Sequence, residues 1–174
     1  GRVLFKTVLL QDRSAGGGST ITQQLAKNLF PRDINNKFDI IVAKVKELFT
    51  ASKIEDLYSK EEILQAYLNE VYLGQAGRRS INGFGLAARF YFGKSVKELD
   101  LGEVATLVGL VKGASYYNPR RNPERAKERR DLILGLMADN NVISDAQRIQ
   151  AQGKPLLTAD SNRAGQREYP AFLE

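Results

Sequence analysis

The sequence predicts a mainly α-helical protein with a single core. Helix-start signals recur along its 174 residues, and the apolar residues between them follow helical spacing with little of the alternation that indicates strands. A chain of this length is sufficient for one compact domain. The composition, 43% hydrophobic and 26% charged, is that of a folded protein and argues against global disorder.

The first two helices are predicted from a cap and from apolar spacing. Thr20 and Gln23 form a capping box that starts a helix running to about Phe30, before Pro31 stops it. Residues 40–58 are predicted to form the longest helix, because apolar residues recur there at intervals of three or four. These residues are Ile41, Val45, Leu48, Phe49, Ile54 and Leu57.

The later helices are predicted from their N-terminal caps. Asn122 followed by Pro123 marks the start of one of them. Stretches rich in glycine or proline at residues 16–18, 74–85 and 113–119 are predicted to be loops. The remaining capping boxes pair Ser59 with Glu62, Ser95 with Glu98, Asp100 with Glu103, and Ser144 with Gln147.

Residues 1–155 are predicted to form the domain, and residues 156–174 a loosely held linker toward a following domain. We interpret the chain as a fragment of a longer protein, since residues 1–5 lack the start methionine and the layout of a signal peptide. Its apolar runs are far shorter than the roughly 20 residues that span a bilayer, so no transmembrane helix is predicted.

Charge and the missing residue types limit the chemistry. The formal charge of +6 favours an anionic partner. The absence of cysteine and histidine excludes disulfides, thiolate metal sites and the commonest general base. Proton transfer by this chain would therefore depend on carboxylates, Lys or Tyr.

A glycine loop directly before a helix N-terminus forms the first candidate site. Residues 16–18 are all glycine, and the free backbone N–H groups of the helix that follows favour an anion such as phosphate. Thr20, Gln24 and Lys27 fall on one face of that helix by their spacing. A capped surface helix after a loop explains the same pattern. A nucleotide P-loop is a poor competitor, because no Lys follows the last glycine.

Glu47 is the candidate catalytic carboxylate. Ala43 and Ala51 lie four residues to either side of it, so it is expected to be partly desolvated, and Lys44 lies one turn before it. An ordinary ion pair on a solvated face is the alternative. Glu103 also lies among apolar residues, but its place in a capping box explains it.

Two other patterns carry no site. Residues 83–87 imitate a dinucleotide-binding fingerprint, but residues 77–82 do not read as the buried strand which that motif requires. A basic run lacks the interleaved aromatic residues of a single-strand binder, so a solvated or lipid-facing helix is preferred to a nucleic-acid site. The run consists of Arg120, Arg121, Arg125, Lys127, Arg129 and Arg130.

Several segments, in order, resemble the signature motifs of the peptidoglycan glycosyltransferases (glycosyltransferase family 51) of bifunctional class A penicillin-binding proteins. The segment that resembles the family's second motif is Gly17-Gly-Ser-Thr-Ile-Thr-Gln-Gln-Leu-Ala-Lys-Asn28. The third, fourth and fifth resemble Lys44-Val-Lys-Glu47 with Tyr58-Ser-Lys-Glu-Glu-Ile-Leu64, Tyr67-Leu-Asn-Glu-Val-Tyr-Leu-Gly74 with Tyr91-Phe-Gly-Lys94, and Glu103-Val-Ala through Tyr117-Asn-Pro119. The resemblance covers nearly all of residues 1–155 and lacks the first motif.

The resemblance implies a mainly α, lysozyme-like bilobal fold with a membrane-facing lobe. It also implies polymerisation of lipid II: the 4-hydroxyl of an incoming lipid-linked disaccharide attacks the anomeric carbon of the growing chain and displaces its lipid pyrophosphate with inversion. The family's general base belongs to the first motif, which contains a Glu-Asp pair and a histidine. This chain alone is therefore expected to be inactive.

The resemblance also assigns roles to residues. Glu47 matches a carboxylate that supports the pyrophosphate, directly or through a divalent cation such as magnesium, and no tightly bound cofactor is expected. Lys27, Lys44 and Lys112 match cations on the phosphate side. The remaining donor-site candidates, which match contacts or lie in the same motifs, are Ser19, Thr20, Gln24, Asn28, Lys46, Tyr72 and Gln75.

The two helices that carry most of these residues are expected to pack through Ile21, Leu25, Val45 and Leu48. Such packing would bring the polar rows of the two helices together and form a cleft facing the glycine loop. In that cleft Lys27, Lys44 and Glu47 would meet the donor pyrophosphate.

The implied partners are lipid II, the growing glycan strand, the membrane surface and other cell-wall synthesis proteins, but no nucleic acid. The implied location is the periplasmic side of the bacterial inner membrane. A lysozyme-like hydrolase is one rival, although its acid would need to be a protonated carboxyl, whereas lysines favour a phosphate leaving group. A non-catalytic module that binds lipid II or a partner protein is the other. No serine of this chain is followed by lysine three positions later, so the penicillin-reactive motif is absent from it.

Overall fold

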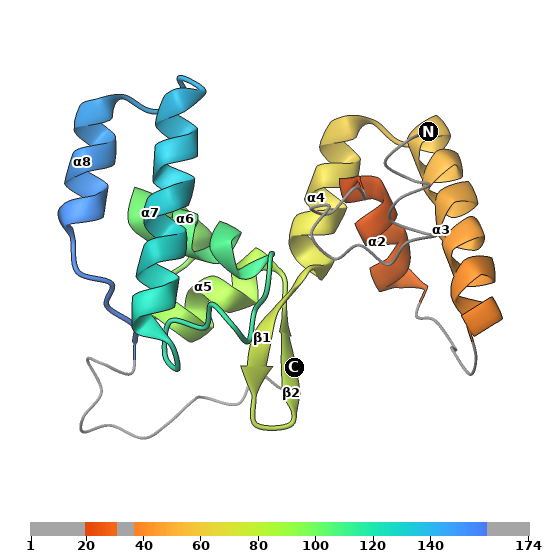
Figure 1. Cartoon of the computed structure of the whole chain (residues 1–174), viewed down its shortest axis with the longest axis horizontal. Helices are drawn as coiled ribbons and strands as arrows, with labels where there is room; N and C mark the ends of the chain where they lie inside the picture. Colours follow the sequence, from red (N-terminus) through yellow and green to blue (C-terminus); the bar gives the residue numbers. More distant parts are fainter. Residues whose placement is uncertain (1–19, 31–36, 160–174) are drawn as a thin grey trace. The chain divides into compact units, whose positions relative to one another are not determined.

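The computed structural model describes residues 20–30 and 37–159 (Figure 1). Contacts divide the chain into two compact units, residues 1–71 and residues 72–174. The described residues form helices and one two-stranded sheet. The predicted mainly α fold class is thereby confirmed.

The first unit contains α2 (Ile21–Leu29), α3 (Lys37–Leu57) and α4 (Lys60–Glu70). α2 contacts both other helices. The predicted caps are present: the Thr20 hydroxyl accepts from the Gln23 backbone N–H at 3.2 Å, and Ser59 and Glu62 form a complete capping box. Hydrogen bonds from the Ser59 backbone and side chain hold the pKa of Glu62 below its ordinary value. The buried apolar side chains of this unit are Leu25, Ala26, Ala51, Ile63, Tyr67 and Val71.

α3 begins before the predicted residue 40 and buries a different face from the expected one. Its buried residues are Glu47 and Ala51, which lie four positions apart. Val45 and Phe49 are 60% and 63% exposed. Ile21 on α2 is also exposed, so the expected packing through Ile21 and Val45 is wrong.

The second unit begins with a hairpin that the sequence did not predict. β1 (Tyr72–Ala76) pairs with β2 (Arg79–Asn82) in antiparallel orientation, and the hairpin overlaps residues 74–85, which were expected to be a loop. Gly77 makes the turn with φ 59°, a conformation that glycine adopts readily. β2 buries only one of its side chains, Ile81, so it is not the buried strand of a dinucleotide-binding fold.

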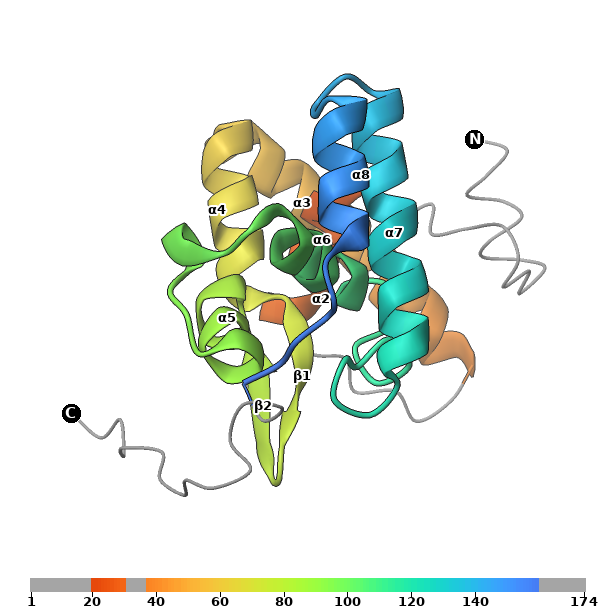
Figure 2. The same cartoon turned by 90° about the vertical axis from the view of Figure 1, so that its left-hand side faces the viewer.

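Helices α5 (Phe84–Phe92), α6 (Leu101–Leu110), α7 (Pro123–Asp139) and α8 (Asp145–Gly153), with a short 3₁₀ helix η1 (Val96–Glu98), complete the second unit. α7 contacts both α6 and α8, and lies beside α8 in both views (Figure 2). The three helices share a core of Ala105, Ile133, Leu134 and Ala151. The predicted boxes at Ser95, Asp100 and Ser144 are all present.

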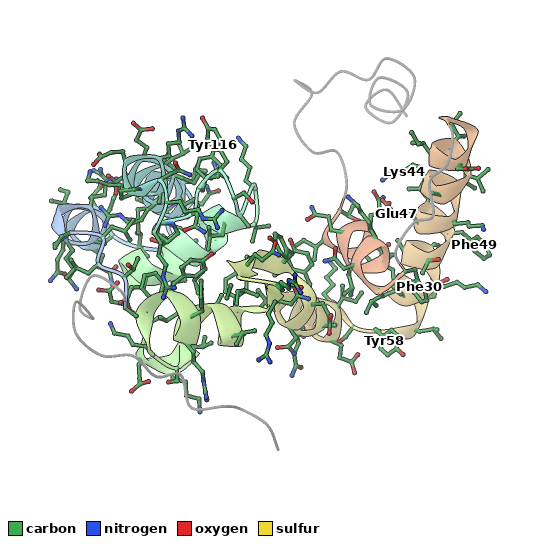
Figure 3. All side chains as sticks on the ribbon, turned by 90° about the horizontal axis from the view of Figure 1, so that it is seen from below. Phe30, Lys44, Glu47, Phe49, Tyr58 and Tyr116 are labelled. Atoms are coloured by element: carbon green, nitrogen blue, oxygen red, sulfur yellow. The ribbon has the colours of Figure 1, made fainter. Side chains whose placement is uncertain are left out.

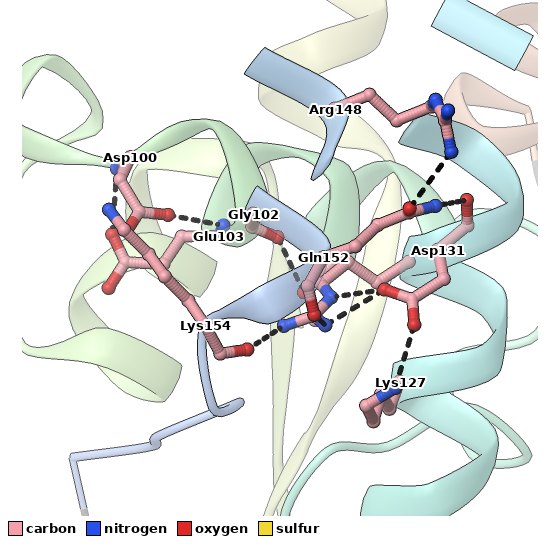
Figure 4. Close-up of polar contacts among 10 residues, drawn as sticks. Asp100, Gly102, Glu103, Lys127, Asp131, Arg148, Gln152 and Lys154 are labelled. Carbon is pink, nitrogen blue, oxygen red and sulfur yellow. Dashed lines mark hydrogen bonds and ion pairs between the residues drawn. The ribbon is translucent and has the colours of Figure 1, made fainter. Parts of the chain in front are cut away.

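Arg130 joins α7 to α8 and to the residues that follow α8. Its partners Asp131, Gln152 and Lys154 are labelled in Figure 4. Its side chain is 1% exposed. Nη1 donates to the Lys154 carbonyl at 2.8 Å, Nη2 to the Gln152 carbonyl at 2.9 Å, and Nε to Asp131 Oδ1 at 2.8 Å. The expectation that the whole basic run lies on a solvated face is therefore wrong for Arg130.

The segment after α8 lies in the second unit as far as the structure describes it. Thr158 is buried, and the Ala159 backbone N–H donates to the Tyr91 carbonyl at 2.7 Å. Most of the predicted linker, residues 160–174, lies outside the described residues. The boundary at residue 155 stays a prediction.

Candidate active site

α2 and its N-cap Thr20 carry four of the predicted donor-site residues. Thr20, Lys27 and Asn28 are exposed, and Gln24 is half-buried. The Tyr67 hydroxyl on α4 donates to Gln24 Oε1 at 3.0 Å, and burial raises the pKa of Tyr67, so its hydroxyl stays protonated. α4 thus fixes the orientation of the Gln24 amide. Ser19 and the glycine loop lie outside the described residues.

Tyr67 is not among the predicted site residues, although it opens the segment that resembles the fourth motif. Periodicity places it four residues after Ile63, so both lie on the buried row of α4. That spacing indicates a core tyrosine. The partner of its hydroxyl depends on how α2 and α4 pack, which periodicity does not reveal.

Glu47 and Lys44 form an ion pair on α3 in which the carboxylate is buried and the lysine is half-buried. Their side chains are 4% and 19% exposed, and Lys44 Nζ donates to Glu47 Oε1. The alternative of an ion pair on a solvated face is therefore wrong, and the predicted desolvation of Glu47 is present. Lys46, by contrast, is exposed.

The Glu47–Lys44 pair lies on the side of α3 that faces α2, whereas Phe49 points to the opposite side (Figure 3). A carboxylate that is paired with a lysine and has little water around it can hold a fixed charge beside a substrate. α2 also carries the exposed Lys27. The convergence of Lys27 with the pair and with the glycine loop stays a prediction.

β1 carries two further candidates, Tyr72 and Gln75, and an irregularity places them on one face. Tyr72 is opposite Asn82 and Gln75 is opposite Ser80, with a register shift between Tyr72 and Gly74. Side chains directly opposite each other share a face, and positions 80 and 82 of a regular strand point the same way. Tyr72 and Gln75 therefore lie on the same exposed face, although a regular strand would point residues three apart to opposite faces.

Lys112 is exposed just after α6, and its backbone N–H donates to the Gly109 carbonyl.

The basic run that follows Lys112 has aromatic partners in space. The Arg125 guanidinium lies 4.4 Å from the centre of the Tyr116 ring, and Arg129 lies 5.7 Å from that of Tyr117. Tyr116 is labelled in Figure 3. No aromatic residue is interleaved with the run, as the sequence analysis states, and these two ring partners come from the loop that precedes it.

Two absences hold for residues 20–30 and 37–159. These residues contain no group of three or more acidic, His or Cys side chains that could hold a metal ion. Among their helices, none combines the length and the apolar character that crossing a bilayer requires.

Comparison with known proteins shows the family. The transglycosylase family model matches residues 1–138. Penicillin-binding protein 1B of Vibrio cholerae is 47% identical over 162 residues, which are 93% of this chain and 20% of that protein. The Escherichia coli protein of the same name is 45% identical over 148 residues, 85% of this chain and 17% of that protein.

A crystal structure of penicillin-binding protein 1A from Haemophilus influenzae is similar with a TM-score of 0.54 and 41% identity, over 60% of this chain and 15% of that one. The chain thus spans about a fifth of the length of the curated relatives it matches. The family match, residues 1–138, includes the Gly-Ser-Thr segment, β1, α6 and nearly all of α7. The chain belongs to the transglycosylase family.

Proposed function

We propose that the protein carrying this chain polymerises lipid II into glycan strands, with inversion at the anomeric carbon and release of lipid pyrophosphate. The observation that carries the proposal is the Glu47–Lys44 pair, with its buried carboxylate, on the α2 side of α3. It lies within the residues matched by the transglycosylase family. A lysine beside the leaving group suits a pyrophosphate better than a sugar hydroxyl, which favours transfer over hydrolysis.

In this mechanism the chain supplies charge and positioning. Lys27 and Lys44 stabilise the negative charge that develops on the departing pyrophosphate, and Lys112 adds to the positive potential. Within the first unit Gln24, held by Tyr67, is the candidate for orienting the donor. Within the second unit Tyr72 and Gln75, which share a face, are the candidates. The general base that deprotonates the attacking hydroxyl comes from the family's first motif, so this chain alone should not make glycan.

A magnesium ion at the pyrophosphate is part of the same proposal. Magnesium is commonly bound through one or two carboxylates together with substrate phosphates. Glu47 is a single carboxylate whose oxygen Oε1 already accepts from Lys44. This fits a shared ion better than an all-protein metal site, and the ion would neutralise charge on the leaving group.

Lys27→Ala tests the donor site. In a protein that joins this chain to the first motif, the variant should raise the KM for lipid II about tenfold, because one charged contact to phosphate is lost. The effect should shrink as salt is added, since Lys27 is exposed and its field is screened. Initial rates of glycan synthesis against lipid II concentration, at low and high salt, measure both.

Lys97→Ala is the matched control, since it removes an exposed lysine from η1 and should leave the KM unchanged. An unchanged KM in Lys27→Ala would contradict the donor-site role. Lipid II binding without polymer in the joined protein would indicate the non-catalytic module. Release of sugars from finished glycan would indicate the hydrolase.

We also propose that the first unit lies against the periplasmic face of the inner membrane through α3. Ile41, Val45 and Phe49 are spaced four apart on this helix and are 50%, 60% and 63% exposed. Lys53 Nζ lies 4.9 Å from the centre of the Phe49 ring. An exposed apolar stripe with a lysine beside an aromatic ring suits the interface between lipid headgroups and acyl chains.

Phe49→Ser should weaken binding of the chain to vesicles of anionic phospholipid about tenfold. Moving a Phe side chain from water into an apolar environment is favourable by about 1.5–3 kcal/mol, and the variant loses this contribution. Cosedimentation with vesicles measures the partition. Val142→Ser, which removes an exposed apolar residue between α7 and α8, is the control and should bind as the parent does. Equal losses of vesicle binding in the two variants, or unchanged vesicle binding in Phe49→Ser, would contradict the role of α3.

A further inference from the structure

The irregularity in β1 is held by a buried tyrosine on α5. The Tyr91 hydroxyl donates to the Leu73 carbonyl at 2.9 Å. Leu73 is the residue at which the pairing of β1 with β2 shifts register. A strand that carries an extra residue leaves that residue without a partner in the ladder. The Tyr91 hydroxyl therefore provides a hydrogen-bond partner at the point where β2 does not.

The surroundings of Tyr91 leave it little freedom. Its side chain is fully buried, and its hydroxyl also accepts from Asn118 Nδ2 at 3.4 Å. Asn118 is itself buried and accepts from the Arg120 backbone N–H at 2.9 Å. Burial raises the pKa of Tyr91 to about 12, so the hydroxyl keeps its proton and stays a donor throughout the working pH range.

Gly74 allows this close approach. A Cβ placed on it would lie 2.2 Å from the Tyr91 hydroxyl oxygen, which no real side chain could tolerate. Gly74 also has a φ of 155°, which non-glycine residues rarely adopt. β1 therefore has a glycine next to its register shift, and the Tyr91 hydroxyl of α5 binds the strand at that point. Tyr72 and Gln75 share a face because of the register shift.

We propose that Tyr91 is a positioning residue for donor binding, acting through the register shift of β1 on Tyr72 and Gln75. This inference rests on the proposed function, in which those two side chains contact the lipid-linked donor. Register shifts of this kind re-aim side chains near active sites. Without the Tyr91 hydroxyl, Leu73 loses its partner, and β1 can move toward regular pairing, which would turn Gln75 away from Tyr72.

Tyr91→Phe tests the inference in a protein that joins this chain to the first motif. The ring remains and only the hydroxyl is lost. The expected result is a KM for lipid II raised about tenfold, with kcat changed less than about twofold. Ser144→Ala, which removes the cap of α8, is the control for simple loss of stability and should leave the KM unchanged. A Tyr91→Phe variant with the parent KM would overturn the inference.

A double-variant cycle separates positioning from a general structural role. If Tyr91 acts through Gln75, then Tyr91→Phe should raise the KM no further in a Gln75→Ala background. Full additivity of the two effects would overturn the inference. In the chain itself, NMR cross-strand contacts between Gln75 and Ser80 should weaken in Tyr91→Phe, and their full retention would also overturn it. Failure of the proposed function is distinguishable, because the parent protein would then make no glycan at all.

Discussion

Glu47→Gln, in a protein that joins this chain to the family's first motif, is expected to lower the rate of glycan synthesis about a hundredfold. The substitution removes the negative charge of a side chain that is 4% exposed while nearly preserving its shape. The Glu47 carboxylate acts through the cations that it holds, Lys44 and the proposed magnesium ion, and these stabilise the negative charge that develops on the pyrophosphate in a site with little water. The measurement is kcat at saturating lipid II.

Glu103→Gln is the matched control for this variant. Glu103 is also a carboxylate paired with a lysine, since Lys94 Nζ lies 2.7 Å from its Oε1. Its Oε2 accepts from the Asp100 backbone N–H, and an amide oxygen can replace it there. Glu103→Gln should therefore lose some stability and keep its turnover. Full turnover in Glu47→Gln, or equal losses of turnover in the two variants, would contradict the role of Glu47.

Arg130→Ala is expected to lower the free energy of unfolding by about 3 kcal/mol. The guanidinium is buried, and its removal takes away its hydrogen bonds to the carbonyls of Gln152 and Lys154. It also takes away the partner of Asp131 Oδ1. Urea unfolding of the chain, followed by circular dichroism, measures the loss.

Lys127→Ala is the control, because Lys127 contacts the same carboxylate of Asp131 from an exposed position. Surface pairs of this kind contribute about 0–1 kcal/mol. The stability loss in Arg130→Lys should lie between those of Arg130→Ala and Lys127→Ala. A lysine keeps the charge but cannot donate hydrogen bonds to three acceptors from one rigid plane. An Arg130→Ala variant as stable as Lys127→Ala would show that the network does not hold α8 in place.

The helices could be predicted from sequence because their signals are local. Ser59 with Glu62, and Ser144 with Gln147, form their caps in the structure as the spacing indicates. Which face a helix buries is not local. α3 buries Glu47 and Ala51 and exposes Val45 and Phe49. Apolar spacing usually indicates the face of a helix that packs in the core, but in α3 these regularly spaced apolar residues lie on the exposed face.

The hairpin and its register shift could not be predicted for a related reason. The segment from Tyr72 to Asn82 contains glycines that resemble loop residues, and its strands are short. A register shift is a property of two strands together, so neither strand alone records it. The place of Tyr72 and Gln75 on one face follows only from the pairing.

The attachment of residues 154–159 determines how a pull on the chain would be transmitted. Tension applied beyond Ala159 would first load the bond from its backbone N–H to the Tyr91 carbonyl, and then the bonds from Arg130 to the carbonyls of Gln152 and Lys154. Since the Tyr91 side chain holds the Leu73 carbonyl, the first residue to bear the load is the one that supports β1. Tension on the chain beyond Ala159 would thus strain β1, which carries Tyr72 and Gln75, before it strained α8.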